Sequence, residues 1–326
     1  MPQCAPLQDG EAADSRPMLG CYNGAVVTTT SRMYRDEADY GRIRALLAEI
    51  LRLQGPPVDC TAGDLDWWRF AWGASPTDIE TARLWEDEAG RLVAVAWFGY
   101  ALVDQFIHPD HRDLEDETLV WAESQRAEEA RNPEVVHTLA AFAFERDPVR
   151  PALLARRGYV RTDSYGLRFG QHLTGSLPAP DLPRGYRIRA LLGEEDLERR
   201  VAVHRAAFES TKVTEVEYRV LQSAPSYRID QDFVVEAPDG SFAAFALLWV
   251  DEANRTMVFE PVGCHPDHRR RGLTRTLLVE ACRRMRARGV EQALVGTSNR
   301  NAAAAALYRS AGFVDLDRFH EWKLTL

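Results

Sequence analysis

The sequence predicts an α/β fold, in which helices flank a mixed sheet in an α+β layout. The fold is built as two tandem copies of one domain. The chain has 326 residues, which is longer than a single domain usually is. The pentapeptide HPDHR occurs twice, at 108–112 and at 265–269. Helix and strand patterns also follow one another in the same order around each copy. Several landmarks that recur in one order at nearly one spacing indicate a duplication.

Each half opens with the pattern of an amphipathic helix. The segments 33–50 and 189–208 place acidic residues before apolar residues at three- and four-residue steps. A strand–turn–strand pattern follows at 83–103 and 233–250, with a glycine in each turn. We therefore expect a β-hairpin just before each HPDHR, and a largely antiparallel sheet in each half.

The halves match a third time near their ends. ALLARRGYV at 152–160 and ALYRSAGFV at 306–314 each predict a helix that ends at a glycine, Gly158 or Gly312, and passes into a strand. The segment GSLPAPDLPRG between the halves has the proline and glycine content of a domain boundary. The predicted organisation is a flexible polar tail at 1–22, a first domain at 23–174, a linker at 175–185 and a second domain at 186–326.

Composition limits the possible partners. The formal net charge of −9 disfavours non-specific binding of nucleic acid. Five scattered cysteines without a C-x-x-C pair argue against a zinc site or a disulfide scaffold, and favour the reducing cytoplasm. The sequence has no run of about 18–20 apolar residues, the length that a membrane span requires. We expect a cytoplasmic protein without a metal, nucleic-acid or membrane partner.

The second HPDHR copy continues as RRGLT, between a predicted strand and a predicted helix. Free N–H groups in the first turn of a helix converge on an anion, and a glycine such as Gly272 lets the backbone approach it closely. Arg269, Arg270 and Arg271 add charged donors. The alternative is a solvated basic run before an ordinary helix, but the glycine at the turn favours a phosphate site.

The first copy continues differently, and we expect it to bind no phosphate. Arg112 is followed by four carboxylates within five residues, and no glycine is present. Negative charges where the phosphates would lie repel the ligand. These carboxylates belong to Asp113, Glu115, Asp116 and Glu117.

The second half resembles the GNAT acyltransferase superfamily, whose signature is [Q/R]-x-x-G-x-[G/A]. Arg269, Gly272 and Thr274 occupy the three signature positions, although Thr274 replaces the usual small residue. TSNRNAAAAALYRSAGF resembles the downstream N-x-x-A-x-x-L-Y-x-x-x-G-F block of the family, which places Asn301 and Tyr308. The resemblance covers 186–326 well. In the first half it extends to layout alone, because Asp147 and Leu154 stand in place of the asparagine and tyrosine.

The resemblance implies two tandem GNAT-like domains, of which the second is catalytic and the first is degenerate and lacks a cofactor site. It also implies acetyl-CoA as co-substrate. In the family, the strand before the phosphate-binding turn splays from its neighbour, and Pro261 favours such a splay here. The implied coenzyme contacts are Val262, Gly263, Cys264, Arg269, Arg270, Arg271, Gly272, Leu273, Thr274, Arg275, Asn301 and Tyr308.

Acyl transfer to an amine requires removal of a proton, an oxyanion site and protonation of the leaving thiolate. Tyr308 suits the protonation, and backbone N–H groups of 262–264 suit the oxyanion. For the base we prefer Glu260, acting directly or through water. Asp251, Glu252 and the C-terminal carboxylate of Leu326 are the competing candidates.

Two side-chain types suggest other chemistry but lack its context. His265 and His268 have no cysteine or carboxylate at zinc-ligand spacing, so we expect no metal. Cys264 has no Cys-His-Asn context and is more simply a small strand residue. A nucleotide-binding P-loop is disfavoured because its motif is missing from the sequence.

The predicted function is transfer of an acetyl group to a primary amine of a small molecule or peptide, by direct attack in the second domain. The alternative is a non-catalytic acyl-CoA sensor or partner-binding module, which would have no need of Tyr308. The sequence leaves both a monomer and a dimer open, and it does not identify the amine.

Overall fold

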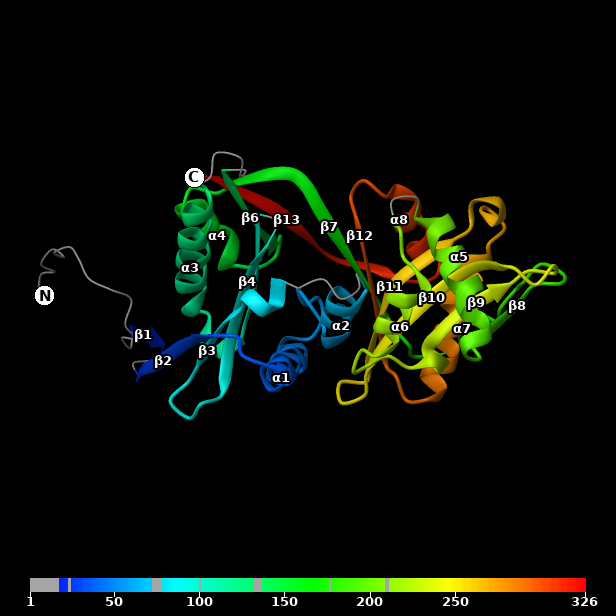
Figure 1. Cartoon of the computed structure of the whole chain (residues 1–326), viewed down its shortest axis with the longest axis horizontal. Helices are drawn as coiled ribbons and strands as arrows, with labels where there is room; N and C mark the ends of the chain where they lie inside the picture. Colours follow the sequence, from blue (N-terminus) through cyan, green and yellow to red (C-terminus); the bar gives the residue numbers. More distant parts are fainter. Residues whose placement is uncertain are drawn as a thin grey trace, which may run out of the picture.

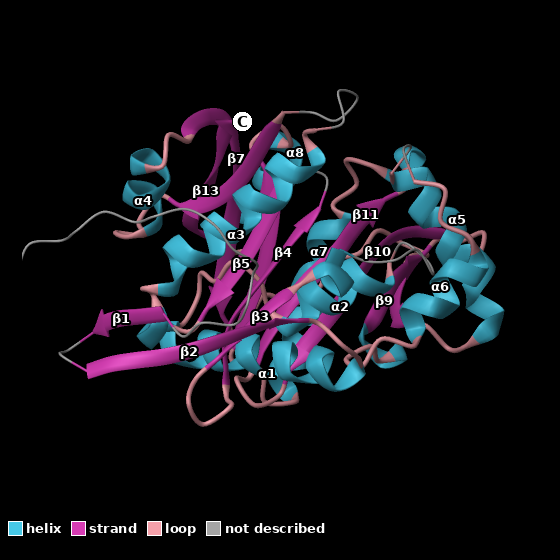
Figure 2. Cartoon of the chain, turned by 60° about the vertical axis from the view of Figure 1, so that its left-hand side comes forward, coloured by secondary structure: helices cyan, strands magenta, loops and turns pink. Residues whose placement is uncertain are grey.

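The computed structural model describes residues 18–22, 25–71, 78–99, 101–131, 137–175, 177–208 and 211–326. Two lobes lie side by side along the long axis of the molecule, one formed mainly by each half of the chain (Figure 1). Helices pack along the strands in both lobes (Figure 2). Among the described helices, none is both long and apolar enough to cross a membrane.

The first half contains the predicted helix, hairpin and final helix–glycine–strand unit in that order, although the strands β1 and β2 precede its first helix. Its strands are β1 (Met18–Tyr22), β2 (Ala25–Met33), β3 (Arg83–Glu86), β4 (Leu92–Gly99), β5 (Leu102–Ile107), β6 (Thr138–Phe144) and β7 (Val160–His172). Its helices are α1 (Glu37–Gln54), α2 (Ala62–Phe70), α3 (Leu114–Glu129) and α4 (Arg150–Arg156). Of the predicted tail, residues 1–17 lie outside the described residues, whereas 18–22 form β1 and pair with β2.

The second half repeats this order from β2 onward, and the start of the helix predicted at 189–208 is a strand, β8, instead. Its strands are β8 (Arg187–Ala190), β9 (Asp232–Glu236), β10 (Phe242–Asp251), β11 (Thr256–Cys264), β12 (Gln292–Ser298) and β13 (Val314–Thr325). Its helices are α5 (Leu197–Ala207), α6 (Glu215–Gln222), α7 (Leu273–Ala287) and α8 (Ala302–Ser310). The expected hairpins are present as β3–β4 and β9–β10, and their turns contain Gly90 and Gly240 at positive φ.

Within the described residues, thirteen strands form one sheet in the order β1-β2-β3-β4-β5-β6-β13-β7-β12-β11-β10-β9-β8. The pairs β5–β6 and β11–β12 are parallel, and the other pairs are antiparallel. The predicted α/β class with a largely antiparallel sheet is therefore confirmed. Glycines end the matching helices as expected, with φ of 88° at Gly158 and 100° at Gly312.

The last strand of each half is exchanged with the other half. Strand β13, from the second half, lies between β6 and β7, where Lys323 pairs with Ala140 and Phe319 with Gly166. Strand β7, from the first half, pairs in turn with β12, where Arg168 faces Gly296. Figure 1 shows both strands running between the lobes. The division at 175–185 thus remains a prediction from the sequence repeat, because the two halves share one continuous sheet.

Helix α2 of the first half also packs on the second half. Its Trp67 belongs to a buried cluster that contains Trp249 of β10 and Val258 of β11. The buried carboxylate of Asp66 accepts hydrogen bonds from the Tyr40 hydroxyl at 2.7 Å and from the Ser226 backbone N–H at 2.9 Å. One side chain therefore ties a helix of the first half to a loop of the second.

Gly63 allows this close approach, and replacing it by alanine is expected to destabilise the protein by about 1–3 kcal/mol. A β-carbon at Gly63 would lie 2.3 Å from Cβ of Trp249, an atom fixed by the backbone of β10. Urea unfolding of Gly63→Ala measures the loss. The matched control is Gly41→Ala in α1, where a β-carbon would meet no described atom within 4 Å. That variant should keep or slightly raise stability, because alanine favours helix over glycine. Equal behaviour of the two variants would contradict the close packing of α2.

Candidate functional site

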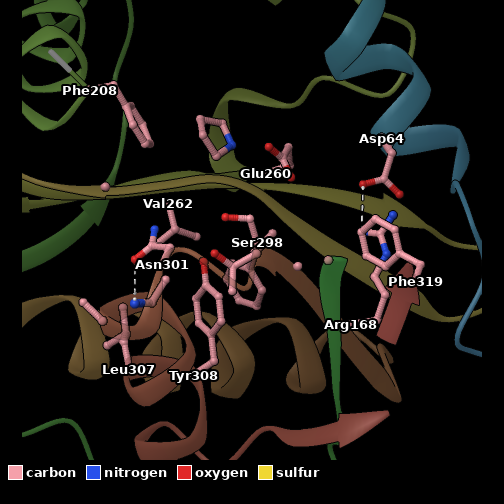
Figure 3. Close-up of a pocket in the computed structure, with 18 of the residues that line it drawn as sticks. Asp64, Arg168, Phe208, Glu260, Val262, Ser298, Asn301, Leu307, Tyr308 and Phe319 are labelled. Carbon is pink, nitrogen blue, oxygen red and sulfur yellow. Dashed lines mark hydrogen bonds and ion pairs between the residues drawn. The ribbon is translucent and has the colours of Figure 1, made fainter. Parts of the chain in front are cut away.

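A cleft of about 1230 Å³ lies where the two halves meet. Its walls come from β11, β12, α7 and α8 of the second half, and from α2, β5 and β7 of the first (Figure 3). Every predicted site residue except Arg271 lines this cleft. The structure therefore brings together residues that the sequence places in separate motifs.

Strand β11 opens one wall of the cleft. Its parallel pairing with β12 extends to Phe259, which faces Val295, while its pairing with β10 continues to Cys264. Beyond Phe259, the edge of β11 that faces β12 lies outside the parallel ladder. Alternate N–H groups of an antiparallel strand point away from its partner, so the stretch 260–264 presents donors toward the cleft. This is the splay that Pro261 leads us to expect.

The turn before α7 has the geometry of an anion cradle. Gly272 is the N-cap of α7 and adopts a left-handed conformation, with φ of 76°. A β-carbon there would meet no described atom within 4 Å, so the space beside the turn is open. The N–H groups of the first helical turn, at Leu273, Thr274 and Arg275, have no intrahelical acceptor. A diphosphate group fits this combination of open space, free donors and helix dipole.

The arginines of this turn have different environments. Arg269 donates through Nε to the Cys264 carbonyl oxygen at 3.4 Å, and Arg270 lines the cleft at a positive φ of 61°. Arg271 instead donates to the Tyr186 hydroxyl and to the Asp267 carbonyl oxygen. Arg271 is thus the one predicted contact that does not line the cleft in the described structure.

Glu260 lies at the point where β11 and β12 separate. Trp249 of β10 fixes its backbone by donating Nε1–H to the Glu260 carbonyl oxygen at 2.7 Å. Burial raises the pKa of the Glu260 carboxyl to about 7, and the nearby Asp64 carboxylate contributes in the same direction, whereas Arg168 opposes them. A carboxyl group with this pKa can exchange a proton near neutral pH.

Tyr308 projects from α8 toward the cleft (Figure 3). Its ring packs edge-on against Phe169 at 5.6 Å between centroids, and the residue is 6% exposed. Burial, and then the charge of Glu260, raise the pKa of the phenol above its ordinary value, so Tyr308 keeps its proton near neutral pH. Asn301 accepts the Ala304 N–H at 3.0 Å and so caps the helix that carries Tyr308.

The first HPDHR copy folds like the second up to its arginine. His108 and His265 each accept, through Nδ1, the N–H two residues on at 3.2 Å. After the arginine the copies differ, because Glu115 occupies the position of Gly272. The buried Glu115 carboxylate binds Arg112 and Arg150. Internal carboxylates, rather than an open space, thus surround the arginine of the first half.

The competing bases lie away from the cleft. Asp251 and Glu252 line a smaller cavity of about 340 Å³, and Asp251 accepts hydrogen bonds from Asn254 in the β10–β11 turn. Leu326 follows β13 at the end that pairs with β6, where its N–H donates to the His137 carbonyl oxygen. These positions leave Glu260 as the sequence-predicted carboxylate that lines the cleft.

The remaining candidates behave as side chains of the turn. His265 caps the short turn, and His268 shares a hydrogen bond of 3.0 Å with the Tyr186 hydroxyl. Among the described residues, no three histidine, cysteine or acidic side chains form a group that could hold a metal ion. Burial raises the pKa of the Cys264 thiol, which disfavours the nucleophilic thiolate.

Sequence reasoning missed the side chains that the first half adds to the cleft. Asp64 and Trp68 come from α2, and Arg168 comes from the exchanged strand β7. Phe208 and Phe319, from the second half, line the same cleft outside the motifs. No motif signals these residues, because their position depends on how the halves dock.

Comparison with known proteins gives a family. The model of the Acetyltransferase (GNAT) family matches residues 201–313. A mycothiol acetyltransferase from Saccharomonospora viridis is 26% identical over 227 residues, covering 66% of this chain and 72% of that protein. Another, from Frankia casuarinae, is 27% identical over 282 residues, covering 80% of this chain and 77% of that protein.

Solved structures share the whole architecture. A GCN5-related N-acetyltransferase from Sphaerobacter thermophilus has a TM-score of 0.64 at 20% identity, covering 91% of this chain and 95% of that chain. A tandem GNAT protein from the clavulanic acid biosynthesis pathway has a TM-score of 0.63 at 19% identity, covering 91% and 98%. At these identities the likeness shows the fold, in which two GNAT units form one chain. Residues 201–313 of the second half therefore match the GNAT acetyltransferase family, and the chain as a whole has the fold of tandem GNAT proteins.

Proposed function

We propose that the protein transfers the acetyl group of acetyl-CoA to a primary amine, and that the reaction takes place in the second half of the chain. The observation that carries this proposal is the position of Glu260 and Tyr308, two proton-exchanging groups that line one cleft beside an open anion cradle. The match of residues 201–313 to the GNAT family implies acetyl-CoA as the donor. The relatives named mycothiol acetyltransferase suggest a small-molecule acceptor, whose identity they do not fix for this chain.

The residues of the cleft have complementary roles in this proposal. The N–H groups at the start of α7 and the arginines 269, 270 and 275 would hold the diphosphate, while the edge of β11 would align the pantetheine arm. Acetyl-CoA supplies a thioester, whose carbonyl carbon the amine attacks directly. Backbone N–H donors in the 262–264 stretch would stabilise the negative charge that develops on the carbonyl oxygen.

Proton transfers complete the proposed reaction. Glu260 removes a proton from the ammonium form of the acceptor, which gives a neutral amine able to form the new C–N bond. The C–S bond breaks as the amide forms, and the Tyr308 hydroxyl gives its proton to the leaving thiolate. The second proton, which the nitrogen loses on becoming an amide, restores the Tyr308 hydroxyl. The two groups thus perform opposite tasks, because Glu260 titrates near neutrality whereas Tyr308 stays protonated.

The experiment that tests the proposal incubates the protein with acetyl-CoA and a panel of primary amines, and follows release of the coenzyme thiol. We expect thiol release that depends on the amine and forms an equal amount of acetylated product. Tight binding of acetyl-CoA without turnover on any amine would instead favour the acyl-CoA sensor. A protein that binds no coenzyme would contradict both.

The pH dependence provides a sharper prediction for Glu260. Because the base must be deprotonated, kcat/KM should rise as the pH increases through about 7. Glu260→Gln cannot accept a proton, so it should lower kcat about 10²-fold and abolish that rise. The matched control is Glu252→Gln, a neighbouring carboxylate that lines the smaller cavity. A Glu260→Gln profile with the same acidic limb as the wild type would remove Glu260 from the role of base.

A further inference from the structure

Helix α2 of the degenerate half reaches the strand that carries Glu260. Gly63 packs directly on Trp249, and the same Trp249 donates its indole N–H to the Glu260 backbone. The next residue of α2 is Asp64, which is 2% exposed and lines the cleft near Glu260. The docking of α2 therefore brings a buried carboxylate of the first half to the proposed base.

Thr61 fixes the direction of the Asp64 carboxylate. The backbone N–H and the hydroxyl of Thr61 both donate to Asp64 Oδ2 at 2.8 Å, which closes a capping box at the start of α2. The other carboxylate oxygen, Oδ1, lies 4.0 Å from Nη1 of Arg168. Asp64 is thus held by its own helix through one oxygen, while the other forms a long ion pair with Arg168 at the cleft (Figure 3).

Arg168 reaches the same place from the exchanged strand β7. It faces Gly296 of β12, and a β-carbon on Gly296 would lie 2.9 Å from Arg168 Nη1, so the guanidinium passes close over the glycine. Its Nη2 donates to the Asp59 carbonyl oxygen at 2.6 Å, and its guanidinium lies 5.2 Å from the centre of the Phe319 ring. Nε has no hydrogen-bond partner among the described residues. The cation is therefore held near Glu260 by the Asp59 carbonyl oxygen, and its ion-pair partner is the Asp64 carboxylate at 4.0 Å.

Among the other charged groups that line the cleft, Arg269, Arg270 and Arg275 belong to the turn before α7, whereas Asp59, Arg150 and Asp104 have partners within the described structure. Asp59 and Arg150 form an ion pair at 3.1 Å, and the Asp104 carboxylate accepts the Trp97 indole N–H at 3.1 Å. Tyr308 faces Glu260 from α8 as a neutral hydroxyl. Asp64 and Arg168 are the charged groups whose fields act on Glu260, in opposite directions.

We propose that Asp64 and Arg168 are opposed positioning residues that set the charge of Glu260, so that the degenerate half takes part in catalysis without binding coenzyme. The negative charge of Asp64 favours protonated Glu260, and the positive charge of Arg168 favours the carboxylate. This inference rests on the proposed function, because Glu260 must act as the base for its charge to limit the rate. It assigns the first half a role in the chemistry through α2 and β7.

The experiment compares the acidic limb of kcat/KM against pH in three variants. Asp64→Asn should move the limb to lower pH and Arg168→Gln to higher pH, each by about half to one pH unit. The double variant should lie between the two. Asn can still accept the Thr61 hydrogen bonds, so the capping box of α2 is kept. The ionisation of the amine is the same in all arms and cannot produce opposite displacements.

Glu128→Gln is the control for a change of net charge, because Glu128 is an exposed residue near the end of α3 and does not line the cleft. Its limb should coincide with that of the wild type. The inference would be overturned if Asp64→Asn and Arg168→Gln moved the acidic limb in the same direction. It would also be overturned if both variants lowered the plateau of kcat/KM without moving the limb. Either result leaves acetyl transfer intact. Absence of transfer in the wild-type protein would instead refute the proposed function itself.

Discussion

Tyr308→Phe is expected to lower kcat about 10³-fold, while the dissociation constant for acetyl-CoA stays within about threefold of the wild-type value. The variant loses the hydroxyl that would protonate the leaving thiolate. It keeps the ring that packs edge-on against Phe169, so α8 and its cap at Asn301 should remain in place. Steady-state kinetics and calorimetric titration with acetyl-CoA measure the two quantities separately.

The control for this prediction is Tyr159→Phe. Tyr159 is a buried tyrosine of the first half, 3% exposed, and belongs to that half's hydrophobic core rather than to the cleft. Its variant should keep wild-type kcat. Unchanged turnover in Tyr308→Phe would transfer the role of acid to another group, and a parallel loss of coenzyme affinity would make Tyr308 a binding residue.

Gly272→Glu should reduce affinity for acetyl-CoA by about 10²-fold or more, because it places a negative charge at the helix terminus where the diphosphate would lie. The change copies the first half, in which Glu115 occupies the matching position and binds Arg112 and Arg150. In the second half the new carboxylate would compete with the coenzyme for Arg269. Calorimetry with acetyl-CoA measures the loss directly.

Gly272→Asn separates charge from backbone strain. Gly272 has a φ of 76°, a conformation that asparagine tolerates better than most residues. A β-carbon at this position would also meet no described atom within 4 Å. The asparagine variant should therefore bind at least tenfold more tightly than the glutamate variant. Equal losses in both would show that conformation, and not charge, governs binding at this turn.

The first half offers a physical reason for the expectation that it binds no phosphate. In the first half, the buried carboxylate of Glu115 and the carboxylate of Asp147 both pair with Arg112. Carboxylates of the chain itself thus stand where an external anion would bind, and they form the ion pairs of Arg112. The first half keeps the turn of HPDHR and its helix, but it now contributes α2 and β7 to the other site.

Much of the fold could be predicted because its signals are local. The hairpins before each HPDHR and the glycines that end α4 and α8 follow from turn and helix chemistry. The start of α7 at Leu273 follows in the same way from Gly272. That Arg271 contacts the coenzyme stays a prediction. In the described structure its guanidinium donates instead to the Tyr186 hydroxyl.

Other features could not be predicted because they depend on distant pairings. The β7 and β13 segments both follow a short helix and a glycine, so their patterns do not state which neighbour each strand joins. Their exchange places Arg168 opposite Gly296 in the second half. Asp64 lies in a short helix whose sequence shows a capping box but no sign of the strand against which it docks.

The sequence by itself determined the duplication, the α/β class and the anion cradle, because a contiguous turn and the first turn of one helix form that cradle. Only the tertiary structure decided which side chains surround Glu260. Its neighbours come from α2, which lies about 200 residues earlier in the chain, and from β7, which lies about 100 residues earlier. The fields that act on a buried carboxylate depend on distances in space, and strand exchange and helix docking set those distances.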